Sequence, residues 1–222
     1  MGLEIEVLSD AEAVARRGAE VVAASAAAAV DDHGDFTFAV SGGKTPWAML
    51  AHLAGKIPWE KVTIFQVDER VAPEGDPDRN LTQLTRSLPP GGAADVRAMP
   101  VDADDLERAV AEYAATLPGR FDLVHLGLGP DGHTASLVPG DSVLDVTDAL
   151  VALTGVYQGR RRMTLTFPAL DRSRQILWLV TGDNKVDALA RLRAGDRSIP
   201  AGRVSTEHAL VLADEAAAGS GP

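Results

Sequence analysis

An acid and a histidine lie two residues apart in a glycine-rich segment near the middle of the chain. Residues 121–126 (FDLVHL) form a short, mostly apolar run that is typical of a buried parallel strand. Residues 127–132 (GLGPDG) then supply three glycines, a proline and a carboxylate. Glycines at the carboxyl end of a strand allow a sharp turn and a close approach to a ligand. Asp131 and His133 are therefore candidates for acid–base chemistry near neutral pH.

The same glycines match Gly-x-Gly-x-x-Gly, the pattern of dinucleotide-binding folds. That pattern opens a helix, and an acidic residue follows about 20 positions later at the end of a second strand. Here Pro139, seven residues after Gly132, and Gly140 next to it interrupt the segment. The acids that follow lie in a polar run without a preceding apolar strand. We therefore do not expect a dinucleotide, and a plain surface turn is the simplest alternative.

A second ligand-binding segment is predicted at residues 41–46 (SGGKTP), directly after the apolar run 36–40. Thr45 as N-cap and Pro46 at the first helical position indicate that a helix begins here. A strand, a glycine turn and a helix N-terminus in this order present free backbone N–H groups to an anion. The alternative is a helix start without a ligand.

The Gly-Lys-Thr letters of this segment invite comparison with the nucleotide-binding P-loop. That motif, G-x-x-x-x-G-K-[ST], needs a glycine at position 38, where this chain has Phe38 in the middle of a predicted strand. The loop is too short to wrap two phosphates of a nucleotide, whereas a single phosphate monoester fits. The candidate phosphate ligands in this segment are Gly42, Gly43 and Lys44.

Apolar runs and helical patterns alternate along the chain, which predicts one three-layer α/β domain over residues 1–222 with a mostly parallel sheet. The tail after about residue 214 is expected to be disordered. Asn80 is the predicted N-cap of a helix. Because parallel strands end at one rim, four strand ends are expected to meet there. They are Ser41–Thr45, Asp68–Arg70, Gly127–His133 and Gly182–Lys185.

Composition argues against several classes of partner. The net charge of −11 disfavours nucleic acid and anionic membranes, and no apolar run approaches the ~20 residues of a membrane span. The chain has no cysteine, and its histidines and carboxylates lack H-E-x-x-H spacing, so no metal is expected. The N-terminus carries no positive region before an apolar stretch, so we expect a cytoplasmic protein. We also expect a monomer.

Five blocks of sequence, taken in order, resemble the 6-phosphogluconolactonases. The blocks are SGGKTP at 41–46, VDERVAP at 67–73, LGLGPDGHTASLVP at 126–139, RMTLT at 162–166 and TGDNK at 181–185. The resemblance covers nearly the whole chain, and it implies a Rossmann-like α/β fold that is shared with the glucosamine-6-phosphate deaminases. One departure is Lys44, where the lactonase loop more often has serine, and it adds positive charge at the phosphate loop.

The resemblance also implies a reaction and a set of roles. The substrate would be a small sugar phosphate, the δ-lactone of 6-phosphogluconate, hydrolysed without a cofactor. His133 would act as the general base, with Asp131 or Asp68 orienting its ring. Loop N–H groups around Gly127–Gly132 would stabilise the oxyanion. The phosphate-binding residues would be Gly42, Gly43, Lys44, Arg70, Arg162 and Lys185.

Two other functions are alternatives at this point. The deaminases carry a glutamate five residues after the histidine of the third block, where this chain has Val138. A non-catalytic sugar-phosphate sensor would keep the phosphate site without the chemistry, and the intact acids and histidine argue against it. Arg160 and Arg161 are expected to be solvated neighbours of the site. Surface or structural roles are expected for His33, His52, His125 and His208.

Overall fold

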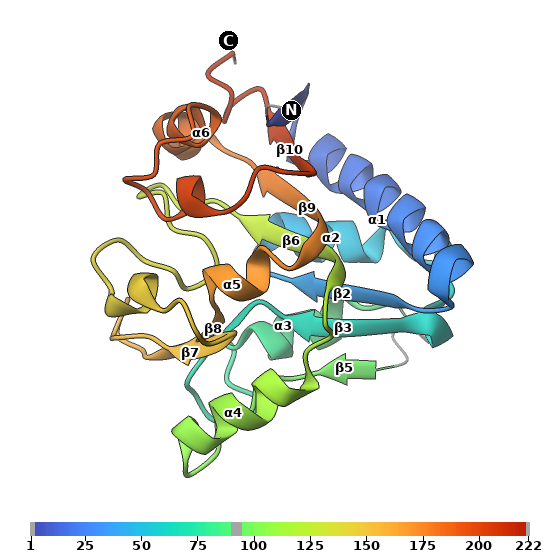
Figure 1. Cartoon of the computed structure of the whole chain (residues 1–222). Helices are drawn as coiled ribbons and strands as arrows, with labels where there is room; N and C mark the ends of the chain where they lie inside the picture. The colour runs from blue at the N-terminus through green and yellow to red at the C-terminus, as the bar shows by residue number, and fades with distance from the viewer. Residues whose placement is uncertain (1–2, 90–94, 221–222) are drawn as a thin grey trace.

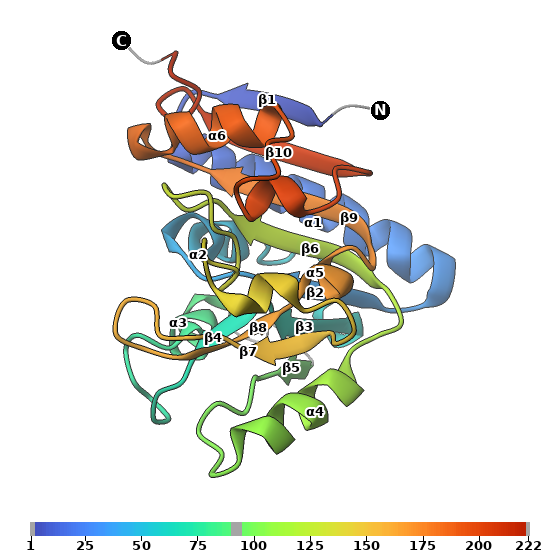
Figure 2. The same ribbon diagram turned by 60° about the vertical axis from the view of Figure 1, so that its left-hand side comes forward.

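The computed structural model describes residues 3–89 and 95–220 of the chain. Seven strands of this part form one sheet in the order β1-β10-β9-β6-β2-β3-β5, and every neighbouring pair is parallel (Figure 1 and Figure 2). The strands are β1 (Glu4–Leu8), β2 (Phe36–Val40), β3 (Val62–Gln66), β5 (Asp95–Arg97), β6 (Phe121–Gly127), β9 (Ser173–Val180) and β10 (Ala209–Asp214). Most are short apolar runs, which suits a parallel sheet covered on both faces.

Helices cover both faces of this sheet. α1 (Ala11–His33), α2 (Lys44–Ala51) and α3 (Asn80–Ser87) pack on one face, and α4 (Leu106–Thr116), α5 (Phe167–Leu170) and α6 (Val186–Arg193) on the other. Side chains alternate along each strand, so Phe38 packs with the first group of helices and Ala39 with the second. The predicted three-layer α/β architecture is confirmed. Of the helices described, none is long and apolar enough to span a membrane.

Short 3₁₀ helices lie in the connections between these elements. They are η1 (Trp59–Lys61), η2 (Ser142–Asp145), η3 (Asp183–Lys185) and η4 (Ala201–Arg203). The third of them follows β9 directly and leads into α6, and it carries Lys185 at its end. This connection therefore holds Lys185 at the carboxyl end of the sheet.

A second, smaller sheet carries part of the predicted site. It contains β4 (Asp68–Arg70), β8 (Arg162–Leu165) and β7 (Val151–Leu153) in that order, with antiparallel pairing. The sequence position of the charged run 68–70 indicated that it ends β3. In the structure it is a separate strand of the small sheet. Val67 connects the two sheets. Its N–H donates to the carbonyl of Val40 in the large sheet (3.1 Å), and its carbonyl accepts from the N–H of Leu165 in the small sheet (2.8 Å). Three charged residues show no strand periodicity, so sequence alone did not reveal this pairing.

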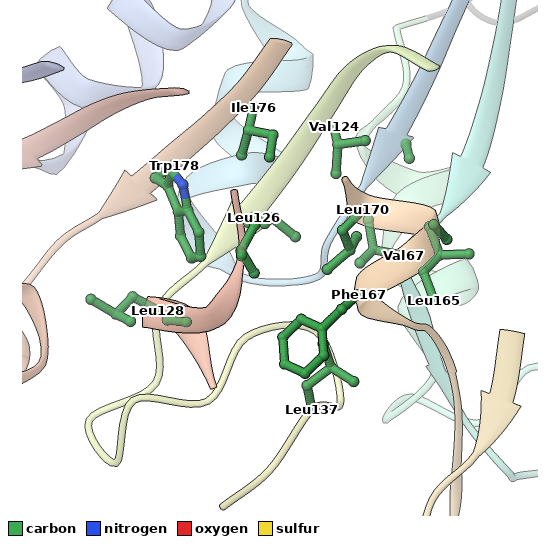
Figure 3. Packing of buried hydrophobic residues seen from close by; sticks show 14 of the residues in the cluster. Val67, Val124, Leu126, Leu128, Leu137, Leu165, Phe167, Leu170, Ile176 and Trp178 are labelled. Atoms are coloured by element: carbon green, nitrogen blue, oxygen red, sulfur yellow. The ribbon is translucent and has the colours of Figure 1, made fainter. Parts of the chain in front are cut away.

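Apolar packing fixes the connection that follows β6. Figure 3 shows Leu126 on β6 and Trp178 on β9 pointing toward Leu128, which follows the strand. Phe167 on α5 lies beside Leu137 of the same connection. All five side chains are buried. The connection is therefore held to the core on both sides of its glycine-rich turn.

Two helix starts near the site differ from the predicted caps. Gly43, with a φ of 142°, is the N-cap of α2, and the hydroxyl of the predicted cap Thr45 instead bonds that of Thr181 (2.9 Å). Asn80 is the first residue of α3 and not its N-cap. Its N–H donates to the carboxylate of Glu69 (2.7 Å). At α2 the predicted cap is thus engaged with a residue far along the chain, and at α3 the Glu69 carboxylate accepts the first N–H, which local patterns cannot show.

The residues after β10 form a packed turn. The N–H of Ala217 donates to the Asp214 carboxylate (2.7 Å), and Ala217 is fully buried. The N–H of Ser220 donates to the carbonyl of Glu215 (2.9 Å). The predicted disorder after about residue 214 is therefore wrong for residues up to 220, and residues 221–222 lie outside the described part.

Candidate active site

Neighbouring strands of the large sheet bring the predicted site residues together. β9, β6, β2 and β3 are adjacent and parallel, so the segments after them reach one rim (Figure 2). A cavity of about 180 Å³ lies at this rim, and all four predicted strand ends contribute to its wall. The predicted residues that line it are Gly42, Asp68, Arg70, His133, Arg162 and Lys185.

Three predicted residues lie beside this cavity and do not line it. Gly43 and Lys44 line an adjoining hollow of about 470 Å³, which shares two arginines with the cavity. The Lys44 side chain is exposed, so its charge lies at the approach to the cavity and not inside it. Asp131 reaches the cavity through its contact with His133.

The glycines after β6 shape a tight turn around His133. The N–H of Gly129 donates to the carbonyl of His133 (2.8 Å), and the N–H of Gly132 to the carbonyl of Gly129 (3.0 Å). A Cβ on Gly129 would collide with the imidazole of His133. Gly132 has a φ of +82°, where an L side chain is strained. Glycine is therefore required at both positions, for close approach at one and for backbone conformation at the other.

The same hydrogen bonds weaken the prediction made for the oxyanion. The N–H groups of Gly129 and Gly132 are engaged inside the turn, and Pro130 has none to offer. This loop is thus a poorer source of oxyanion donors than its composition indicated. Positive side chains on the cavity wall are the alternative source of stabilisation.

His133 and Asp131 form a close pair. The Nδ1 atom of His133 lies 2.5 Å from Oδ1 of Asp131, which also accepts the backbone N–H of His133 (3.2 Å). Partial burial acts to raise the pKa of Asp131, but the N–H and the imidazole of His133 outweigh it and lower this pKa below its ordinary value. An ionised Asp131 favours the proton on Nδ1. The other ring nitrogen, Nε2, meets no hydrogen-bond partner within the described residues, and His133 lines the cavity.

Asp68 is buried and bonds other partners. Its Oδ2 accepts from the hydroxyl of Ser136 (2.6 Å) and its Oδ1 from the side-chain amide of Asn80 (3.4 Å). It makes no hydrogen bond to His133 in the part of the chain that the structure describes. Asp131, and not Asp68, is thus placed to orient the imidazole. Ser136 also accepts from Arg162 (3.5 Å), so it connects the Asp68 carboxylate to the guanidinium.

Arg162 and Lys185 bring positive charge into the cavity wall. Arg162 is 5% exposed, and its Nε is buried without a partner among the described residues. Burial lowers the pKa of Arg162, although the charge of Asp68 opposes this. Burial also lowers the pKa of Lys185, against the effect of Asp131. Since burial penalises the charged form of both groups, an anionic ligand that pairs with them would be favourable.

Asn80 connects the predicted phosphate loop to Arg70. Its side-chain oxygen accepts from Nη1 of Arg70 (2.5 Å), and its amide donates to the carbonyl of Asp68 (2.9 Å). A Cβ on Gly42 would collide with this side chain, so glycine permits the close packing. The N–H groups of Gly42 and Gly43 donate no hydrogen bond within the described chain. They are open to an anion at the N-terminus of α2.

Glu69 supports this arrangement, and sequence reasoning did not single it out. It is fully buried, and its carboxylate accepts from the N–H groups of Asn80 (2.7 Å) and Leu81 (2.8 Å) and from the amide of Gln66 (2.8 Å). The buried guanidinium of Arg79 lies 3.6 Å away. The carboxylate thus satisfies the first N–H groups of α3 and holds Asn80 at the cavity. Its place in the charged run DER was the sequence signal for it.

Tyr157 is a second residue that the sequence did not reveal. Its hydroxyl donates to Oδ2 of Asp131 (3.3 Å), and its ring lies against the imidazole of His133. No motif contains it, because it reaches the site from the connection between β7 and β8. Its neighbour Arg161 is exposed, whereas Arg160 is half-buried and lines the hollow that holds Lys44. Arg160 pairs with carboxylates of the loop before α3, and the guanidinium of Arg161 donates to a backbone carbonyl.

The remaining histidines lie outside the cavity. His33 contacts Asp122 (3.0 Å), and His52 contacts Glu12 (2.8 Å). His125 is buried in β6, where burial lowers its pKa to about 3. Among the residues described, no group of three or more histidines, cysteines or acids is arranged to hold a metal ion.

A larger hollow of about 930 Å³ lies at the opposite end of the sheet. It is lined by the first residues of several strands, including Glu4, Asp122 and Arg174, and by none of the predicted site residues. Open parallel sheets bind ligands at the carboxyl ends of their strands. The smaller cavity with its histidine and cations is therefore the candidate active site.

Proteins of similar sequence and structure show the family of this chain. The family model described as "Glucosamine-6-phosphate isomerases/6-phosphogluconolactonase" matches residues 9–212. The chain is 35% identical to 6-phosphogluconolactonase of Mycobacterium tuberculosis with all of both chains covered, and 33% identical to that of Nostoc sp. with 97% of each covered. The crystal structure of 6-phosphogluconolactonase from Thermotoga maritima aligns with a TM-score of 0.83 at 26% identity, over 95% of this chain and 98% of that one. The chain belongs to the glucosamine-6-phosphate isomerase/6-phosphogluconolactonase family.

Proposed function

We propose that the chain hydrolyses 6-phospho-D-glucono-1,5-lactone to 6-phospho-D-gluconate, in the oxidative pentose phosphate pathway. The observation that carries this proposal is a single cavity whose wall holds His133, paired with Asp131, together with the buried Arg162 and the half-buried Lys185. A phosphorylated lactone needs both features, since a base must activate water at its carbonyl and positive charge must hold its phosphate. Relatives at 33–35% identity that carry the lactonase name support the same reaction.

His133 acts as the general base in this reaction. Asp131 holds the Nδ1 proton, so Nε2 accepts a proton from water while the water oxygen attacks the lactone carbonyl. The bond from the carbonyl carbon to the ring oxygen then breaks, and the imidazolium returns a proton to that oxygen. Water is the only other reactant, so the scheme uses no cofactor. The positive charge of Arg70 on the cavity wall stabilises the charge that develops on the carbonyl oxygen.

The phosphate binds at the N-terminus of α2. The free N–H groups of Gly42 and Gly43 donate to its oxygens, and Arg162 and Lys185 pair with its charge. Lys44, exposed in the adjoining hollow, adds long-range attraction. In a chain of net charge −11, this local concentration of cations is what allows an anionic substrate to approach.

Val138 favours lactone hydrolysis over deamination of glucosamine 6-phosphate. This residue occupies the position where the resemblance places the glutamate of the deaminases, five residues after His133. It is 7% exposed, and a hydrocarbon side chain cannot carry a proton. The proton relay of the deaminases therefore lacks a member here. Release of ammonia from glucosamine 6-phosphate would contradict this ranking.

We further propose that the enzyme works in the cytoplasm as a monomer. A phosphorylated substrate does not cross a bilayer unaided, because transfer of its charge into hydrocarbon is costly. The proposed base and cations all belong to one chain, so the proposed reaction does not call on a residue of a second copy. Light scattering at micromolar concentration tests the monomer, and a stable dimer would contradict it.

The activity is tested against the spontaneous opening of the lactone. Lactone generated from glucose 6-phosphate is mixed with micromolar enzyme in a buffer that contains a chelator, and acid release is recorded. A rate above the uncatalysed background is the expected result. No acceleration would refute the proposal, and tight binding of 6-phosphogluconate without turnover would indicate a sensor.

A further inference from the structure

We propose that Tyr157 is a positioning residue that couples the acid–base pair of the cavity to its phosphate-binding arginine. Tyr157 lies in residues 154–161 between β7 and β8, hereafter the tyrosine loop. The inference rests on the proposed lactonase function, because it gives Tyr157 a part in the same reaction. Three contacts of the Tyr157 side chain, and the turn that holds this side chain, support the inference.

The hydroxyl of Tyr157 belongs to the acid–base pair. It donates to Oδ2 of Asp131 (3.3 Å), while Oδ1 of the same carboxylate lies 2.5 Å from Nδ1 of His133. The two rings meet edge to face, with centroids 5.5 Å apart and an interplanar angle of 66°. Burial and the charge of Asp131 raise the pKa of Tyr157, so the hydroxyl stays protonated and donates. Tyr157 thus shares the charge of Asp131 and limits rotation of the imidazole.

The face of the same ring supports the buried cation. The Cζ atom of Arg162 lies 5.0 Å from the ring centroid, within the range of a cation–π contact. The next residue, Gln158, accepts from Nη2 of Arg162 (3.2 Å). Neither partner carries a negative charge. The tyrosine loop therefore orients the guanidinium while leaving its charge available to a phosphate.

The backbone of the tyrosine loop holds the ring in place. The N–H of Tyr157 donates to the carbonyl of Arg160 (3.0 Å), and the N–H of Arg160 to the carbonyl of Tyr157 (3.3 Å). The two residues between them, Gln158 and Gly159, have φ of 51° and 81°, as in a two-residue type I′ hairpin turn. Arg160 then pairs with Asp76 (3.0 Å). Tyr157 thus lies at the start of a hydrogen-bonded turn, and the ion pair of Arg160 connects this turn to the loop before α3.

Several other charged groups line the same cavity as His133. They are Lys185 after β9, Arg162 on β8, and Asp68 and Arg70 on β4. None of them donates a hydrogen bond to Asp131 within the described residues, whereas Tyr157 does. Removing the hydroxyl should therefore change the charge that Asp131 presents to His133, with the surrounding charges unaltered.

The variant Tyr157→Phe isolates the hydroxyl. Without the donated hydrogen bond, Asp131 presents more negative charge to Nδ1 and stabilises the protonated imidazole. We expect the acid limb of the kcat profile to move to higher pH by roughly half a unit. At neutral pH kcat should fall about two- to tenfold. KM should not change, because the ring still lies against Arg162.

The variant Tyr157→Leu removes the ring as well. Arg162 then loses its cation–π partner, and KM should rise about three- to tenfold in addition to the change in kcat. Val156→Ala is the matched control, since Val156 is 71% exposed in the same loop. It should leave kcat, KM and the pH profile unchanged. Circular dichroism and thermal unfolding establish that all three variants are folded.

A readout independent of turnover separates this inference from the proposed function. The imidazole of His133, assigned with His133→Gln, is titrated by NMR in the original chain and in Tyr157→Phe. A shift of its midpoint to higher pH supports the coupling even if no lactonase activity is found. An unchanged midpoint and an unchanged kcat profile in Tyr157→Phe would overturn the inference. An equal rise of KM in the Phe and Leu variants would overturn the role of the ring.

Discussion

Replacement of His133 by alanine tests the proposed chemistry most directly. The change removes the imidazole from the cavity wall and leaves the cations in place. Asp68 cannot readily replace the base, because Ser136 and Asn80 occupy its oxygens (2.6 and 3.4 Å). We therefore expect kcat to fall by the usual worth of general base catalysis, ~10²–10⁴, or about 3–5 kcal/mol of barrier. KM should change little, because the phosphate contacts remain.

The assay is acid release from freshly generated lactone, with the spontaneous rate measured in parallel and subtracted. His52→Ala is the matched control, since His52 pairs with Glu12 and lines none of the hollows described above. It should leave both kinetic constants unchanged. If His133→Ala kept a kcat close to that of the original chain, the general-base assignment would be refuted. Family membership would stand, and Asp131 would be the next carboxylate to test.

Three further predictions follow from single side chains. Lys185→Ala should raise KM about ten- to a hundredfold, because it removes a charge-assisted contact worth about 1.5–3 kcal/mol. Initial rates over a range of lactone concentrations measure this KM. Glu69→Ala removes the buried carboxylate that accepts from the N–H groups of Asn80 and Leu81 and lies beside Arg79. It should lower the free energy of unfolding, measured with urea, by about 3–5 kcal/mol. Hydrogen bonds to Asp35 and Asp122 raise the pKa of His33, so the stability it adds is complete below about pH 6.5 and is lost as pH rises through the raised value. Urea titrations of the original chain and of His33→Gln should converge at alkaline pH, and a constant difference at all pH values would contradict this linkage.

The large sheet was predictable because its strands are mostly local apolar runs. Residues 36–40 and 121–126 needed no partner to be recognised, and the shared direction of parallel strands then placed the segments after them at one rim. The small sheet was not predictable in this way. Its strand Asp68–Arg70 is charged, and it pairs with Arg162–Leu165 from a distant part of the chain. Only the three-dimensional register shows that pairing.

The site residues also differ in whether a local sequence pattern reveals them. His133 and Gly42 were found because glycine-rich turns after apolar strands are visible in sequence. Ser136, Tyr157 and Glu69 were not found as site residues. Ser136 and Glu69 lie inside recognised motifs, but their bonds to Asp68 and Asn80 cannot be read from those motifs, and Tyr157 lies in no motif at all. Sequence reasoning thus located the groups placed to meet a ligand but missed the groups that orient them.

The two sheets set the distance between the two ends of the substrate. His133 is carried by the large parallel sheet, and Arg162 by the small antiparallel one. Val67, Leu137 and Leu165 are fully buried in one core cluster that spans both sheets. A close-packed interior of this kind resists small displacements. The separation of base and phosphate anchor is therefore fixed before a ligand arrives, as efficient positioning requires.

This arrangement also leaves polar groups unsatisfied where a ligand would meet them. Arg162 Nε and Ser41 Oγ are buried without partners among the described residues, and both residues line the cavity. A buried polar group without a hydrogen-bond partner costs about 1–3 kcal/mol of stability. A phosphate presents several strong acceptors, so its binding would recover part of that cost, whereas a neutral sugar would recover less. These buried donors therefore favour a phosphorylated substrate over its unphosphorylated counterpart, which links the polar groups of the cavity wall to the specificity of the proposed reaction.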